Sequence, residues 1–228
     1  MVAVPPSLDA SVPPSVDRSA EVRRILERYL VEVVERHELC PWARAARERG
    51  ELAVGILWGA PPAGAWVAEA ERLLALPGAR VAMVVAPELA IARAAFGALR
   101  DTVASRIPSA GVAEFHPDAA LDLATPARLV PFLRRSPDPL LQLVPLALID
   151  AVRAVRAVPP VAPLAQQATM LGGHAAAARR EVTAQIAAAN HATVAAAHAA
   201  IAQALDAIAA DRRAAYARVG ISRAPWPA

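Results

Sequence analysis

The chain has 228 residues, of which 56% are hydrophobic, and its formal net charge is +3. Its length allows one large domain or two small ones, and proline or polar residues interrupt its apolar runs, so we expect no continuous spanning segment of roughly 18 to 20 apolar residues. All 24 basic residues are arginine and only 4% of residues are aromatic, which disfavours a stacking surface for single-stranded nucleic acid.

The N-terminal stretch is rich in proline and serine and shows no hydrophobic periodicity. We expect residues 1–17 to form a disordered tail and residues 18–228 to form a single domain. The stretch lacks the charged and continuous apolar regions of a signal peptide, so a cytoplasmic location and no membrane partner are expected. Cys40 is the single cysteine, which excludes an intrachain disulfide framework.

Hydrophobic periodicity predicts alternating helices and strands in the first half of the chain. Pro41 cannot continue the first predicted helix, which places Cys40 at a corner between helix and loop. The alternation predicts an α/β fold with a small, mostly parallel sheet of three or more strands and helices packed on it. The predicted helices are 19–38, 66–76 and 88–107, and the predicted strands are 52–59, 80–87 and 111–117.

The second half is predicted to be helical. A short helix is expected at 125–135, and a further helix at Pro139, with Asp138 as its N-cap. A connection at 152–163 precedes an Ala-rich helix over 164–218 that is interrupted near Gly172 and Gly173, so 158–228 reads as a helical C-terminal extension.

His116 is the first candidate catalytic residue. It ends a predicted parallel strand, and ligands of open α/β sheets collect at the carboxyl ends of such strands. Asp118 is placed to orient its imidazole. The alternative is a histidine that closes a strand with one backbone hydrogen bond.

Cys40 is the second candidate catalytic residue. A functional thiol needs a depressed pKa, which His116 supplies only if the fold brings the two side chains together. The alternative is a small apolar residue of the core, because free cysteine is commonly buried.

Arg134, Arg135 and Ser136 precede the helix predicted at Pro139. Arginines and a hydroxyl beside a helix N-terminus form a natural anion site, so these residues are candidates for substrate binding. The alternative is that the arginines are solvated beside a turn.

The C-terminal histidines divide between packing and function. His191 and His198 stand two helical turns apart, about 10 to 11 Å, too far to chelate one metal together. We expect His198 to pack, and we expect the polar pair Asn190 and His191 to face the site, because buried polar groups need partners. The predicted packing stripe contains His191, Val194, His198, Ile201, Leu205 and Ile208.

Three stretches, in order, resemble a bacterial family known as domain of unknown function fourteen-fifteen, whose members look like LCPFA, FHP and RSPYPxLHLL at these points. Trp42, Asp138 and Gln142 depart from that pattern, and Gln142 replaces a frequent histidine. The resemblance implies a single soluble α/β domain, carries no activity, and draws attention to Cys40 and His116, and also to Pro41, Pro117, Arg135, Ser136 and Pro137. The stretches are LCPWA (39–43), FHPD (115–118) and RRSPDPLLQL (134–143).

Three functions remain open on the sequence. The favoured one is a thiol-dependent hydrolase or transferase for a small anionic substrate, with Cys40 as nucleophile and His116 as base and with no cofactor. The second is a protein that binds a metal, Zn or Cu, or a cofactor through Cys40, His116 and His191. The third is a non-catalytic interaction domain, in which the C-terminal helix forms a homo-oligomer or binds a partner protein.

Overall fold

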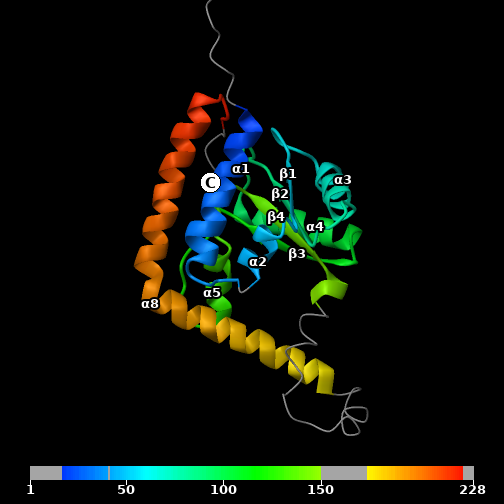
Figure 1. Ribbon diagram of the computed structural model, residues 1–228, viewed down its shortest axis with the longest axis vertical. Helices are drawn as coiled ribbons and strands as arrows, with labels where there is room; N and C mark the ends of the chain where they lie inside the picture. Colours follow the sequence, from blue (N-terminus) through cyan, green and yellow to red (C-terminus); the bar gives the residue numbers. More distant parts are fainter. Residues whose placement is uncertain (1–16, 41, 150–173, 223–228) are drawn as a thin grey trace, which may run out of the picture.

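The computed structural model describes residues 17–40, 42–149 and 174–222, and side chains of the last segment from Ala187 onward (Figure 1). The predicted tail up to residue 16, the connection at 152–163 and the Gly172-Gly173 interruption lie outside these residues. Asp17, predicted to belong to the tail, instead caps the first helix by accepting the Ser19 N–H at 2.8 Å.

The elements follow the predicted order with two exceptions: a short helix at residues 43–48 was not predicted, and a strand takes the place of the helix predicted at Pro139. The helices are α1 (Arg18–Tyr29), α2 (Ala43–Glu48), α3 (Ala63–Leu74), α4 (Arg93–Arg106), α5 (Pro126–Leu133) and α8 (His174–Arg218), and a π-helix, η1 (Leu30–Glu35), continues α1. The strands are β1 (Leu52–Ile56), β2 (Val81–Val85), β3 (Ala110–Phe115) and β4 (Leu140–Pro145).

The sheet is mixed, so the expectation of a mostly parallel sheet needs correction. Its order is β1-β2-β4-β3: β1 and β2 are parallel, whereas β4 is antiparallel to both of its neighbours. The three predicted strands, β1, β2 and β3, therefore do run in the same direction, and β4 is inserted between the second and the third. The α/β class itself is confirmed.

The prediction of a helix beginning at Pro139 is wrong, because residues 140–145 form β4. Leu141 and Leu143 pack against the core on one face of the sheet, while Leu140 packs on the other. A short run that is apolar on both faces suits a central strand as well as a buried helix. The Pro139 carbonyl accepts the Ala86 N–H at 3.0 Å, so this proline begins a strand of the ladder.

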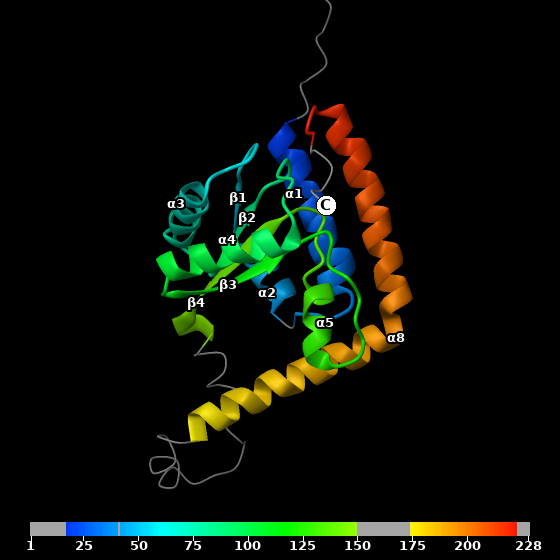
Figure 2. The same cartoon turned by 180° about the vertical axis from the view of Figure 1, so that it is seen from behind.

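Helices cover both faces of the sheet (Figures 1 and 2). The α3 and α4 helices pack on one face around Trp66 and Phe96, whose rings meet edge to face at 5.6 Å. The α1, η1, α5 and α8 helices pack on the other face, against Met83, Val85 and Leu140. Because β2 alternates its side chains between the two cores, each face has its own hydrophobic cluster.

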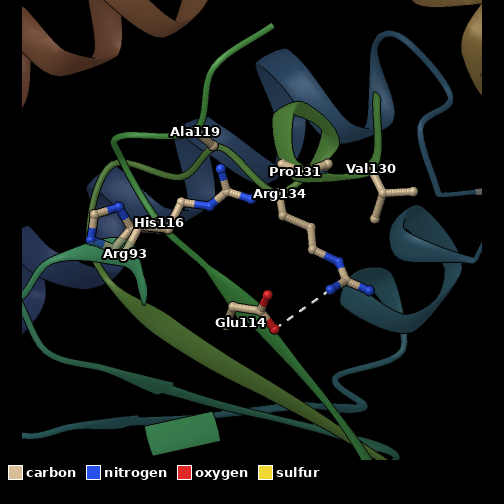
Figure 3. Close-up of a pocket in the computed structure, with 7 residues that line it drawn as sticks. All are labelled: Arg93, Glu114, His116, Ala119, Val130, Pro131 and Arg134. Carbon is tan, nitrogen blue, oxygen red and sulfur yellow. Dashed lines mark ion pairs between the residues drawn. The ribbon is translucent and has the colours of Figure 1, made fainter. Parts of the chain in front are cut away.

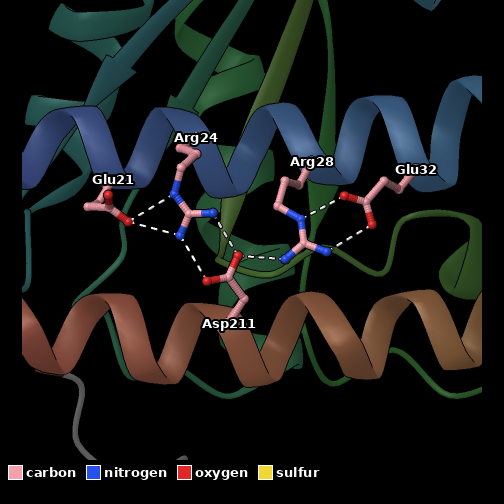
Figure 4. A network of polar contacts seen from close by, with 5 residues as sticks. All are labelled: Glu21, Arg24, Arg28, Glu32 and Asp211. Carbon is pink, nitrogen blue, oxygen red and sulfur yellow. Dashed lines mark hydrogen bonds and ion pairs between the residues drawn. The ribbon is translucent and has the colours of Figure 1, made fainter.

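The α8 helix runs in two legs at a marked angle, and one leg lies along α1 (Figures 1 and 2). Asp211 joins the two helices by accepting hydrogen bonds from Arg24 and Arg28, and these arginines also pair with Glu21 and Glu32 on their own helix (Figure 4). The two arginines hold the pKa of Asp211 well below its usual range, with the hydrogen bond from Arg24 as the main cause. This surface network therefore fixes the register of α8 on α1.

The packing stripe predicted for α8 is largely confirmed. Val194, Ile201, Leu205 and Ile208 are buried in the protein's own core, whereas His198 is exposed, so its predicted packing role is wrong. Residues 187–218 are long and apolar enough to cross a membrane by length and composition alone, which the sequence analysis did not anticipate. In this structure 22% of the apolar window is buried, and those buried side chains pack on the α1 face of the sheet.

Candidate functional site

A cavity of about 630 Å³ lies on the α1 face of the sheet, and we call it the large cavity. Pockets for small molecules have volumes of roughly 300 to 1,000 Å³ and are mostly apolar with a few polar groups. The large cavity fits that description, since Leu26, Leu30, Val34, Met83 and Leu140 are among its walls. Its polar side chains in the part of the chain described are Tyr29, Cys40, Arg49, Glu51, Arg80, Arg134, Gln142 and Asn190, apart from the indole of Trp42.

All three stretches singled out in the sequence contribute to the large cavity. The first supplies Cys40 and Trp42 among others, the second supplies Phe115, and the third supplies Arg134 and Gln142. Gln142 lies on β4 opposite Met83 on one side and Ala113 on the other, so it stands near the middle of the sheet. These stretches are far apart in the chain, and the fold brings them to one hollow.

The corner that carries Cys40 is held by local structure on both sides. Glu38 adopts a left-handed backbone (φ 52°), a conformation that is uncommon outside glycine, and it ends the helical segment there. Beyond the corner, Arg47 on α2 donates two hydrogen bonds, of 2.6 and 3.0 Å, to the buried carboxylate of Glu35. The predicted position of Cys40 between helix and loop is confirmed.

Tyr29 supplies a buried hydroxyl that lacks a hydrogen bond among the described residues. The residue is 2% exposed and lines the large cavity. Burial raises the pKa of its phenol, and the charge of a Cys40 thiolate would raise it further. Tyr29 is therefore a neutral phenol at the wall of the large cavity, which Cys40 also lines, and its buried hydroxyl has no partner among the described residues.

Cys40 lies in an environment that disfavours its thiolate. Burial raises the pKa of the thiol, and the backbone N–H groups of Trp42 and Ala43 act weakly in the opposite direction. The thiol is half-buried and packs against the hydrophobic core. The depressed pKa that a nucleophilic cysteine needs is not what this environment provides.

His116 is held by backbone groups on the other face of the sheet. Its Nε2–H donates to the Ile91 carbonyl at 3.0 Å and its Nδ1 accepts the Asp118 N–H at 3.1 Å, so both ring nitrogens are occupied. The side chain is 2% exposed, and its ring centroid lies 5.9 Å from that of Phe96. Asp118 does hold the imidazole of His116, as expected, but through its backbone N–H and not through its carboxylate, because the Asp118 side chain is exposed.

The sheet separates Cys40 from His116. Successive residues of a strand point to opposite faces, so Phe115 faces the large cavity while Glu114 and His116 face the α4 side. His116 lines a second, small cavity of about 60 Å³ together with Arg93 and Glu114 (Figure 3). The predicted nucleophile and base are therefore not brought together, because the pleat of β3 directs the imidazole away from the thiol.

An alkylation experiment checks this separation. We expect native Cys40 to react with iodoacetamide only as the pH rises above the reference thiol pKa of about 8.5, because burial suppresses the thiolate. Replacing His116 with asparagine is expected to leave the pH profile unchanged. A midpoint well below the reference value that shifts upward in the variant would place both residues in one site.

The expected anion site at residues 134–136 is not formed as predicted, because a strand follows in place of a helix. Arg134 pairs with Glu114 at 3.6 Å, and Arg135 Nε donates to the Pro117 carbonyl at 3.2 Å. Ser136 is buried, and its hydroxyl donates to the Asp138 carbonyl at 2.5 Å. These side chains hold the loop in place, although Arg134 also borders both cavities.

The carboxyl edge of β2 is filled by the protein's own side chains. Asp138 is 3% exposed and accepts hydrogen bonds from Arg212 Nε at 2.7 Å and from the Tyr216 hydroxyl at 2.6 Å. Arg212 also donates to the Pro87 carbonyl at 2.8 Å. The crevice in which α/β proteins usually hold a ligand is therefore occupied here by a buried ion pair between Asp138, just before β4, and Arg212 of α8.

Asn190 and His191 have different surroundings. Asn190 lines the large cavity and donates to the Leu39 carbonyl at 3.2 Å, next to Cys40, and its role in binding stays a prediction. His191 Nε2 lies 2.9 Å from the Leu123 carbonyl and joins α8 to the loop before α5. Within the described residues, no group of three or more His, Cys, Asp or Glu side chains is arranged to hold a metal ion.

Sequence reasoning did not predict five polar side chains of the large cavity as site residues: Tyr29, Arg49, Glu51, Arg80 and Gln142. Tyr29 belongs to an apolar helical stripe, which reads as packing and does not reveal that the hydroxyl lacks a partner. Gln142 carries a usable signal, since it is the one polar residue within the apolar run LLQLV. Comparisons with family models, with curated proteins and with solved structures found no match for this chain.

Proposed function

We propose that this protein binds a small, largely apolar molecule in the large cavity, and that the Tyr29 hydroxyl donates a hydrogen bond to it. The observation that carries the proposal is an apolar hollow of about 630 Å³ bordered by Tyr29, whose hydroxyl has no partner among the described residues. That hydroxyl is buried beside the hollow, so the Tyr29 side chain must turn to reach a ligand. An unsatisfied buried hydroxyl costs roughly 1 to 3 kcal/mol, and a ligand oxygen or nitrogen would remove that cost.

The expected thiol-dependent enzyme is less well supported, because the predicted base, His116, lies on the other face of the sheet and burial raises the pKa of the Cys40 thiol. Zinc or copper binding by Cys40, His116 and His191 is also less well supported, because the first two lie on opposite faces of the sheet and both ring nitrogens of His116 are occupied. Oligomerisation through the stripe of α8 is disfavoured because that stripe is buried in its own chain. In the proposed function, Cys40 forms part of a cavity wall as a neutral thiol.

The test uses 1-decanol as a neutral probe and the Tyr29→Phe variant. Without probe, the variant is expected to be more stable by about 1 kcal/mol in urea unfolding, because an unsatisfied hydroxyl is removed. In calorimetric titration its affinity for 1-decanol is expected to fall about three- to tenfold, because one neutral hydrogen bond is lost. A Tyr29→Phe variant that is more stable but binds 1-decanol less tightly would show that the hydroxyl serves binding. A hydroxyl that served only the fold would lower stability when removed.

Cys40 reports where the probe binds, since it is the only thiol in the chain. Saturating 1-decanol is expected to slow alkylation of Cys40 in the native protein, because the thiol lines the same cavity. An unchanged alkylation rate with bound probe would locate the probe elsewhere. The absence of any binding by wild-type protein would overturn the proposed function.

A further inference from the structure

The opening of the large cavity carries an excess of positive charge. Its described ionised lining residues are Arg49, Arg80, Arg134 and Glu51. Arg134 pairs with Glu114, which leaves two positive charges, Arg49 and Arg80, against the one negative charge of Glu51. Arg49 and Arg80 are exposed, and so is Trp42, with 40% of its surface accessible. The charged groups therefore lie toward solvent, while the interior walls are apolar.

Backbone contacts bring Arg49 and Arg80 to one corner of the opening. Arg49 ends α2, and two residues later the Glu51 carbonyl accepts the N–H groups of Arg80 and Val81 at 2.9 and 3.1 Å. Arg80 lies 3.7 Å from the Glu51 carboxylate, which is a loose ion pair. Arg49 makes no ion pair within the part of the chain that the structure describes. The corner thus has a guanidinium that is not neutralised.

We infer that the molecule bound in the large cavity is an amphiphile whose apolar body lies inside and whose anionic end, a carboxylate or a phosphate, lies against Arg49 and Arg80. This inference rests on the proposed function and adds the class of ligand to it. A guanidinium binds either group with a forked pair of N–H donors, and the exposed position spares the anion the cost of burial. The Tyr29 hydroxyl then meets a polar atom within the body of the molecule.

The test compares decanoate with 1-decanol, which share an apolar chain and differ in charge. In the Tyr29→Phe variant, where no hydrogen bond to the 1-decanol hydroxyl favours that probe, decanoate is expected to bind about tenfold more tightly, since each of two partly exposed ion pairs contributes a few-fold in affinity. The preference for decanoate is expected to weaken as sodium chloride is added, while 1-decanol affinity changes little, because salt screens exposed charges.

Matched arginine variants locate the preference. Arg49→Gln and Arg80→Gln are each expected to weaken decanoate binding about threefold and to leave 1-decanol binding unchanged. Arg93→Gln is the control, because Arg93 is an exposed arginine of the small cavity and its loss changes the net charge equally. Glu51→Gln is expected to strengthen decanoate binding.

The outcomes separate the inference from the proposed function. Equal affinity for the two probes in the Tyr29→Phe variant, or equal loss of decanoate binding in Arg93→Gln and Arg49→Gln, would overturn the inference and leave the cavity as a binding site for neutral molecules. Failure of both probes to bind would overturn the proposed function itself. A decanoate preference that disappears only in the Arg49 and Arg80 variants would support both.

Discussion

Asp138→Asn is expected to lower the free energy of unfolding by about 3 to 5 kcal/mol, because it leaves the buried guanidinium of Arg212 without its anion. Arg212 is 8% exposed, and its remaining described partners are the Pro87 carbonyl and the ring face of Tyr216. Equilibrium unfolding in urea measures the loss. Such a loss would be a large fraction of the stability of a typical domain.

Asp211→Asn is the matched control, because it also removes one carboxylate that binds arginine, and Asp211 stands next to Arg212 on α8. Asp211 also accepts from two arginines, but these contacts are partly exposed, so a loss of about 1 kcal/mol or less is expected. Adding Arg212→Met to Asp138→Asn should cost less than the sum of the single changes, since the unpaired charge is then removed. Equal losses for Asp138→Asn and Asp211→Asn would contradict the role given to the buried pair.

His116→Ala is expected to destabilise the fold by about 2 to 4 kcal/mol, because it leaves a void beside Phe96 and two backbone groups without partners. His116→Asn is expected to cost only about 1 to 2 kcal/mol, since an asparagine side chain can still accept the N–H two residues on. Urea unfolding checks both values. His198→Ala, at an exposed position, should change stability by less than about 0.5 kcal/mol.

The same variants show whether His116 has a role beyond packing. Binding of 1-decanol by His116→Asn is expected to match that of wild type, because the imidazole lies on the opposite face of the sheet from the large cavity. A clear loss of binding in this variant, with the stability largely retained, would mean that the two faces are coupled and would reopen a functional role for the histidine.

Apart from the short helix α2, which was not predicted, the strands and helices up to Phe115 are predictable because their periodicities are clear and proline or glycine marks their ends. The α4 helix is the partial exception: it begins at Arg93, several residues later than predicted. The side chain of Glu88 is engaged with Arg18 and with the Gly59 N–H, which keeps the intervening residues in a loop. Such contacts over a long sequence distance are not visible in a local pattern.

The sequence misleads at residues 138–145, where an aspartate followed by proline matches a helix start. The same aspartate serves a different purpose, since its carboxylate binds Arg212 from 74 residues away. The alternation of side chains along β3 places Phe115 and His116 on opposite faces of the sheet. The alternation alone does not show which of these faces α1 and Cys40 cover. The large cavity is still less predictable, because its walls come from several helices and all four strands.

The pairing of α1 with α8 has a consequence for folding during synthesis. The α1 helix and all four strands leave the ribosome before α8, which covers one face of α1, is made. The contact between Arg24 and Asp211, for example, joins residues that are 187 positions apart. Until then the nascent chain exposes an apolar surface that its own later helix will bury, which is the kind of surface that chaperones bind and that drives aggregation. Truncation before α8 should therefore yield an aggregation-prone chain, with the wall that contains Asn190 missing from the large cavity.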